Sequence, residues 1–237
     1  MATKRAVAVE VFHKTGQVRS RIVDGLAVIL DLRLGDYVIL DKVATAMWRV
    51  LLTADPPDRV PLLERQFAVP AEQLAADLEA FLKQCVERGF LTERPAPLVE
   101  RRTLRRVRRG AAAQRAWWSL LATTRALAMQ GFSSTYRRYA GFAKPVADDR
   151  ELDDLVRRAE RAFARAEHFF VMRAAPKDCL PRSLALYRFM LSAGIPVDHC
   201  IGVMRFPFAA HAWVECRGRV LNDSEANVRL YAELARI

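Results

Sequence analysis

The stretch APKDCLPRSLALYRFMLSAG, residues 175–194, decides how the second half of this chain is interpreted. Its apolar residues recur at helical spacing, and Gly194 followed by Pro196 is typical of a helix end. Cys179 lies at the other end, directly after Asp178, a residue type that caps helix starts. A cysteine in a first helical turn faces unpaired backbone N–H groups and the positive end of the helix dipole, which lower its pKa. The pattern therefore indicates a reactive thiol, and a small apolar core residue is the alternative.

The segment HAWVECRGRVLND, residues 211–223, has the pattern of two strands joined by a turn. A three-residue turn with Gly218 in the left-handed conformation places His211 directly opposite Asp223, on one face of the sheet. A two-residue turn shifts the register by one and places them on opposite faces. We expect the first arrangement, in which the carboxylate hydrogen-bonds to the imidazole and fixes its tautomer.

Together, Cys179, His211 and Asp223 are the residue types of a Cys-His-Asp catalytic triad. The cysteine would be the nucleophile, the histidine would transfer protons, and the aspartate would orient the histidine. The backbone N–H of Cys179 is one candidate donor to an oxyanion. Trp213 is predicted to pack beside the site and to contact substrate.

The remaining cysteines (Cys85, Cys200 and Cys216) fall within apolar patterns and are predicted to be packing residues. His199, Cys200, His211 and Cys216 include metal-ligand types, but no familiar zinc spacing joins them, so neither a metal nor a cofactor is predicted. No signal-peptide pattern is present, and the longest apolar stretch, 116–129, is too short to span a bilayer. Reduced thiols and a cytoplasmic location are therefore expected.

The first block, residues 18–94, is predicted to be a small winged-helix-like domain. LAVILDL (26–32) and DYVILD (36–41) form a predicted hairpin with Gly35 in its turn, and Asp41 is expected to cap a helix. A short helix near 60–67, a longer one over 69–90 and a short strand at 90–93 complete the block.

Two functions suit such a domain: a recognition helix in DNA, or a sheet edge that accepts an extended peptide. The helix over 69–90 exposes mixed charge rather than a basic face, which favours the peptide (Glu72, Asp77, Glu79, Glu87, Lys83, Arg88). Leu78 and Phe81 are the predicted peptide contacts, with plain core packing as the alternative.

A basic run joins the two blocks. The chain carries a formal charge of +11 at pH 7, and ERRTLRRVRRG (100–110) packs six arginines into nine residues. We interpret 95–110 as an Arg-rich linker, either a solvated surface or a docking region for an anionic partner. Interleaved aromatic residues are lacking, so specific nucleic-acid binding is not expected. The second block, 111–237, combines helices with a predicted antiparallel sheet over 199–223, which makes the whole chain α+β.

The motifs CLPRSLALY (179–187), HAWVE (211–215) and LND (221–223) resemble those of transglutaminase-like cysteine proteases. The chain is more closely similar to the lasso-peptide B proteins, the leader peptidases of lasso-peptide biosynthesis. Its first block resembles their leader-binding domain, the RiPP recognition element, and the small chaperone of pyrroloquinoline quinone biosynthesis.

This resemblance implies that the first block binds the leader of a ribosomally made precursor peptide. The second block would cleave the leader from the core peptide with Cys179, His211 and Asp223. The core would then pass to an ATP-dependent lasso cyclase of the asparagine-synthetase type. Three alternatives stay open: a non-catalytic leader-binding chaperone, a protein-glutamine transglutaminase, and a DNA-binding regulator.

Overall fold

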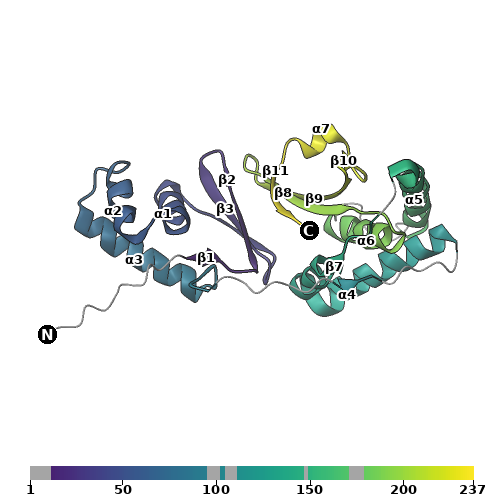
Figure 1. Cartoon of the computed structure of the whole chain (residues 1–237), viewed down its shortest axis with the longest axis horizontal. Coiled ribbons are helices and arrows are strands. Elements are labelled where there is room, and N and C mark those ends of the chain that lie inside the picture. The colour runs from purple at the N-terminus through teal and green to yellow at the C-terminus, as the bar shows by residue number, and fades with distance from the viewer. Residues whose placement is uncertain (1–11, 95–101, 105–110, 147–148, 171–178) are drawn as a thin grey trace. The chain divides into compact units, whose positions relative to one another are not determined.

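The computed structural model describes residues 12–94, 102–104, 111–146, 149–170 and 179–237 (Figure 1). The chain combines helices and sheets, as predicted, and divides into two compact units, the first comprising residues 1–32 and 36–98 and the second residues 33–35 and 99–237. Most of the predicted linker over 95–110 lies outside the described residues. Within it, β6 (Arg102–Thr103) pairs in parallel with β7 (Phe142–Ala143).

The first unit contains a three-stranded antiparallel sheet. β3 (Leu26–Asp31) is its central strand, between β2 (Val18–Val23) and β4 (Asp36–Ile39). The predicted hairpin of β3 and β4 is confirmed, and Gly35 has a φ of 78° in its turn. The sequence prediction missed β2. Asp24 and Gly25, with φ of 46° and 80°, form the two-residue turn that joins β2 to β3.

Three helices follow the sheet. Asp41 caps the first of them, because its Oδ1 accepts a 2.8 Å hydrogen bond from the backbone N–H of Ala44. The second helix begins at Pro56, so the predicted start near Val60 is wrong: proline is well tolerated in a first helical turn, where its missing N–H costs nothing. The helices are α1 (Lys42–Thr53), α2 (Pro56–Glu64) and α3 (Ala71–Glu87). After α3, β5 (Leu91–Thr92) pairs with β1 (His13–Lys14), a strand that precedes the predicted start of the block.

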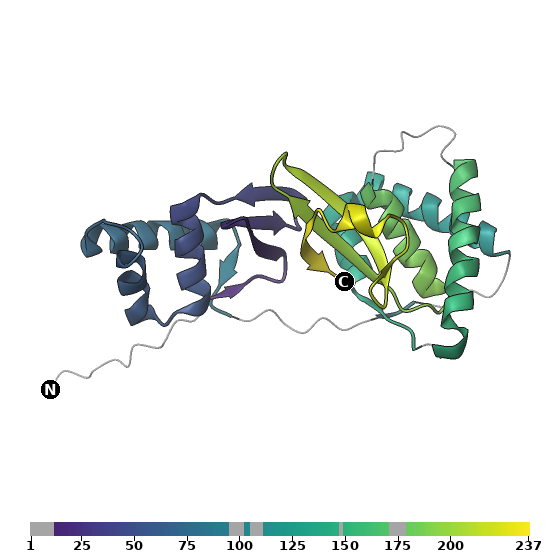
Figure 2. The same cartoon turned by 90° about the horizontal axis from the view of Figure 1, so that it is seen from above.

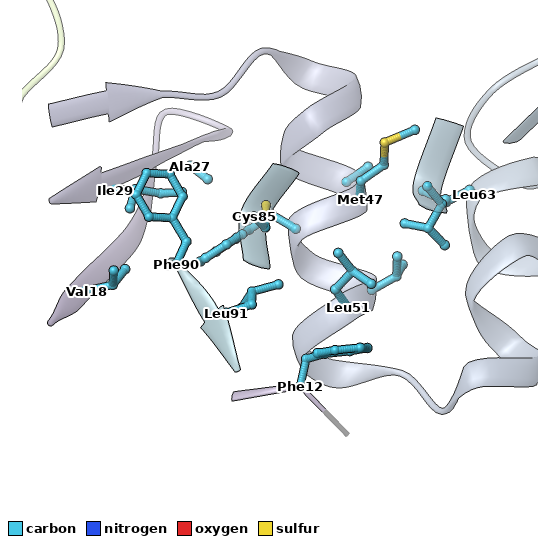
Figure 3. Close-up of a cluster of buried hydrophobic side chains, with 14 of the residues drawn as sticks. Phe12, Val18, Ala27, Ile29, Met47, Leu51, Leu63, Cys85, Phe90 and Leu91 are labelled. Carbon is cyan, nitrogen blue, oxygen red and sulfur yellow. The ribbon is translucent and has the colours of Figure 1, made fainter. Parts of the chain in front are cut away.

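The core of the first unit lies between the sheet and the helices (Figure 3). Ile29 and Leu63 are fully buried in it, and Cys85 is a core residue, as predicted. Leu78 belongs to the same cluster, while Phe81 is half-buried at its margin. The side chain of Leu78 therefore has little surface left for a peptide.

The second unit is built around α6 (Cys179–Ser192), which packs against α4 (Ala112–Ala140) on one side and the sheet on the other (Figures 1 and 2). Leu184, Tyr187 and Leu191 are buried, as the helical spacing predicts. α5 (Asp149–Phe170) covers α4 with an apolar face that includes Val156 and Phe163.

The sheet of the second unit is antiparallel, with strand order β10-β9-β8-β11. The last strand and a short helix, α7, were not predicted. Among the described residues, no helix has the length and apolar character needed to cross a membrane. The elements are β8 (Asp198–Met204), β9 (Ala209–Cys216), β10 (Arg219–Val220), α7 (Glu225–Val228) and β11 (Ala232–Arg236).

Candidate active site

Cys179 is the first residue of α6, and the packing of α6 on β9 brings it to His211. The thiol hydrogen-bonds to the imidazole of His211 and lies against the backbone N–H of Ala212. Burial on its own raises the pKa of Cys179, but these contacts outweigh it and hold the pKa below its ordinary value. The predicted cap, Asp178, lies outside the described residues.

His211 joins the thiol to a carboxylate. Its Nε2 donates a 2.5 Å hydrogen bond to Oδ2 of Asp223, so Nδ1 is the nitrogen left to meet Cys179. The contact with Cys179 raises the pKa of His211; burial opposes this, and Asp223 adds to the increase. Both shifts favour a thiolate beside an imidazolium, the reactive form of a cysteine nucleophile.

The hydrogen bond between His211 and Asp223 is confirmed, but the register from which it was predicted is wrong. Arg217 and Gly218, with φ of 50° and 81°, form a two-residue turn, so Arg219 faces Cys216. Regular pairing would then place the histidine and the aspartate on opposite faces. The pairing ends instead after two residues of β10, and the chain bends over 221–223, which frees Asp223 to reach His211.

Local hydrogen bonds that the sequence analysis missed fix this irregular segment. The Oδ1 of Asn222 accepts from the backbone N–H of Val214 at 2.7 Å. The backbone N–H of Ser224 donates to Oδ1 of Asp223 at 2.6 Å, and Nδ2 of Asn227 donates to its Oδ2 at 2.7 Å. Burial acts to raise the pKa of Asp223, and these donors together with His211 outweigh it and lower the pKa. The sequence signal is Ser224, which caps α7 by accepting from the N–H of Asn227.

Two aromatic rings flank the imidazole of His211. Trp213 stacks at 6.1 Å between ring centroids, and Tyr231 lies at 5.1 Å. Trp213 is only 2% exposed, and its Nε1 donates to Glu215 at 2.7 Å. It therefore lies beside the site, as predicted, while its role as a substrate contact remains a prediction that burial does not favour. Gly202 makes room for both side chains: a Cβ there would lie 2.8 Å from the Trp213 ring and 2.9 Å from the Cβ of Tyr231.

The other cysteines differ electrostatically from Cys179. Burial raises the pKa of Cys85 to about 11 and raises the pKa values of Cys200 and Cys216 as well. All four cysteines lie in the described part of the chain, and Cys179 alone has a lowered pKa. This contrast favours the reactive interpretation of Cys179 over the packing alternative.

His199 has a structural environment. It is fully buried, its Nε2 lies 2.9 Å from Oγ of Ser183, and burial lowers its pKa to about 3. Ser183 therefore anchors α6 to β8, and the neighbouring Arg182 pairs with Glu167 of α5. In the part of the chain that the structure describes, no cluster of three or more His, Cys, Asp or Glu side chains is arranged to hold a metal ion.

Two models of known families match parts of the chain. The family model of the transglutaminase-like superfamily matches residues 117–236, slightly more than half of the 237-residue chain. The chain belongs to the transglutaminase-like superfamily. A second model, coenzyme PQQ synthesis protein D (PqqD), matches residues 27–91. The resemblance to these two domain types is therefore confirmed.

One curated protein is similar to a short part of the chain. The chain is 42% identical over 55 residues to the microcin J25-processing protein McjB of Escherichia coli. The aligned region covers 23% of this chain and 26% of that protein, so the chain spans about a quarter of the length of the curated relative that it matches. No solved structure matches the chain.

Proposed function

We propose that this protein is a cysteine peptidase that removes the leader from a ribosomally made precursor peptide during lasso-peptide biosynthesis. The observation that carries the proposal is the contact chain from Cys179 through His211 to Asp223, with the pKa of Cys179 lowered and that of His211 raised. The protein that contains this Cys-His-Asp contact also has a PqqD domain and is similar to a processing protein, which favours a peptide as substrate.

The first half of the reaction is acyl transfer. The Cys179 thiolate attacks the carbonyl carbon of the scissile bond, and the backbone N–H of Cys179 is our candidate donor to the resulting oxyanion. When the C–N bond breaks, the leaving amine of the core peptide takes a proton from the His211 imidazolium. The leader remains as a thioester on Cys179, and Asp223 keeps the imidazole oriented.

The second half is hydrolysis. Neutral His211 removes a proton from a water molecule, which attacks the thioester carbonyl. Collapse of the second tetrahedral intermediate breaks the C–S bond and releases the leader with a free carboxylate. The proton on His211 returns to the Cys179 sulfur or balances the thiolate as imidazolium. A transglutaminase uses the same thioester with an amine in place of water, and product analysis distinguishes the two.

The first unit would bind the leader at a strand edge. In the order β2-β3-β4, β3 is central, so of the two strands of the predicted hairpin only β4 offers an edge. The N–H of Leu40 bonds to Ala27 of β3, and alternate residues of a strand point the same way. The backbone of Ile39 therefore points away from β3. Its side chain is 42% exposed, which suits an added peptide strand.

The proposed cleavage is tested by mass spectrometry of a leader–core precursor encoded near the gene, incubated with the full chain or with Cys179→Ala. We expect cleavage at one bond by the wild-type chain alone. Intact precursor in both samples, with a lasso cyclase and ATP also present, would refute the peptidase. If a labelled leader still binds in those samples, the chain is a leader-binding chaperone.

The proposed edge is tested by fluorescence anisotropy with a labelled leader peptide. Ile39→Pro removes an outward backbone donor, while Ile39→Val keeps the donor and a similar side chain. We expect at least a tenfold weaker Kd for the proline variant, from the loss of a hydrogen bond and of a strand-compatible backbone. Equal affinities for the two variants would place the leader elsewhere.

The partners and location follow from the same proposal. The freed core peptide would be the substrate of an ATP-dependent cyclase of the asparagine-synthetase type, and both steps would take place in the cytoplasm. A pull-down of the cyclase from a mixture of purified components tests the partnership directly. A DNA-binding regulator, by contrast, would bind duplex DNA with a steep salt dependence that Cys179→Ala leaves unchanged.

A further inference from the structure

We infer that Asn227 is a positioning residue of this site: its side-chain amide holds the Asp223 carboxylate in the orientation that lets it bind His211. The inference concerns the residues around the proposed triad and extends the proposed function to a fourth side chain. Asp223 receives hydrogen bonds from Ser224 and Asn227 that take no part in the proposed acyl transfer or hydrolysis.

The first observation is the geometry at one oxygen atom. Oδ2 of Asp223 accepts from Nε2 of His211 at 2.5 Å and from Nδ2 of Asn227 at 2.7 Å. The other oxygen, Oδ1, accepts from the backbone N–H of Ser224 at 2.6 Å. Without the amide of Asn227, Oδ2 would be held only by His211, the residue that it has to orient. Asn227 therefore supplies a donor, independent of His211, to the oxygen that faces the imidazole.

The second observation is that Asn227 is itself held in place. It lies in α7, where Oγ of Ser224 accepts from its backbone N–H at 3.1 Å. The next residue, Val228, is buried in a cluster with Trp213 and Cys200, and Tyr231 packs against that cluster. The helix is thereby anchored to the aromatic residues that flank His211, so the amide has a fixed direction relative to the imidazole.

The third observation explains why Asp223 needs such a partner. Asp223 follows the end of β10, where no ladder of backbone hydrogen bonds fixes the position of its side chain. Triad carboxylates act through orientation and charge, so a rotated Asp223 stabilises the imidazolium less. Losing the amide donor therefore weakens the imidazolium and, through it, the thiolate of Cys179.

The test measures the thiolate directly, without any peptide. Iodoacetamide alkylation of Cys179 in the full chain is followed against pH by mass spectrometry of the modified peptide. We expect Asn227→Ala to raise the apparent pKa of Cys179 and to slow alkylation near neutral pH about tenfold, the loss of one hydrogen bond to a charged group. Asn227→Leu, which has a similar size and carries neither donor nor charge, is expected to shift the profile in the same direction.

Two controls separate positioning from a structural role. Glu225→Gln changes an exposed residue of the same helix that pairs with Arg229, and it is expected to match the wild type. The double variant Asn227→Ala with Asp223→Ala is expected to have the same alkylation profile as Asp223→Ala alone, because Asn227 acts through that carboxylate. A wild-type profile for Asn227→Ala would overturn the inference, and so would an undiminished effect of Asn227→Ala in the Asp223→Ala background.

The outcome is independent of the proposed peptidase activity. A chain that cleaves no precursor but shows this alkylation pattern would refute the proposed function and keep the positioning role. A chain that cleaves its precursor while Asn227→Ala alkylates like the wild type would do the reverse.

Discussion

Replacing Asp223 with asparagine tests the charge of the proposed triad while preserving its shape. The bond to His211 is charge-assisted, a class worth about 1.5–3 kcal/mol. The two side chains are 16% and 19% exposed, so water screens the pair in part and the lower end of this range, about 1.5–2 kcal/mol, applies. At about 1.4 kcal/mol per factor of ten, this free energy corresponds to precursor cleavage that is 10- to 30-fold slower.

The same free energy appears as a change in titration. About 1.4 kcal/mol is one pKa unit, so the pKa of His211 is expected to fall by roughly one unit in Asp223→Asn. The thiolate–imidazolium pair is populated at pH values between the pKa of Cys179 and the pKa of His211. The substitution is expected to raise the first pKa and lower the second, so this pH range becomes narrower. Alkylation of Cys179 measures its lower limit, and precursor cleavage against pH measures both limits.

A clear result would refute this reasoning. If Asp223→Asn melts at the wild-type temperature and its two pH profiles overlay those of the wild type within a factor of two, the carboxylate does not support the imidazolium. Cys179 and His211 would then act as a dyad, and the short Asp223 contact would be only structural.

Three further outcomes are expected. Iodoacetamide should modify Cys179 before Cys85, Cys200 and Cys216 under native conditions, because only the pKa of Cys179 is lowered; peptide mapping would reveal equal labelling if this is incorrect. Gly202→Ala should lower the free energy of unfolding by about 1–3 kcal/mol, because its methyl group would meet Trp213 and Tyr231, and denaturant titration measures the loss. Between the unfolded pKa of about 6.5 and the folded pKa of about 3, His199 binds a proton only when the chain unfolds, so stability should fall with falling pH by about 1.4 kcal/mol per unit. His199→Gln should flatten that slope in melts at matched pH, and parallel slopes in the two proteins would contradict the assignment.

Local patterns in the sequence were sufficient to predict many of the elements. The apolar spacing of 179–191 predicted a buried helix, and Asp41 and Gly35 marked a helix start and a hairpin turn that the structure contains. β2 was missed because Arg19 and Arg21 interrupt its apolar residues, and a charge on the solvent face of an edge strand is common. β11 was missed because its pairing partner, β8, precedes it by many residues, and a local pattern contains no such information.

In the site, the sequence likewise predicted the residues but not the local geometry that brings them together. Cys179, His211 and Asp223 were chosen from residue types and spacing, and the structure brings them together. The predicted route to the histidine–aspartate pair, a three-residue turn, was nevertheless wrong. Arg217 adopts a left-handed conformation that favours glycine or asparagine, so no local pattern predicts a two-residue turn there. Asn227 was overlooked because its role depends on where a four-residue helix directs its amide.

The two-residue turn at Arg217 and Gly218 also makes the hairpin tip a useful place for engineering. Asp223 is held by Ser224 and Asn227, and Asn222 is tied to Val214, so the carboxylate does not depend on how the strands are joined at that tip. A short epitope or fluorophore-binding sequence inserted between these two residues would lengthen an exposed loop and leave the triad bonds intact. We therefore expect the site to retain its geometry with a reporter on the hairpin that carries its histidine.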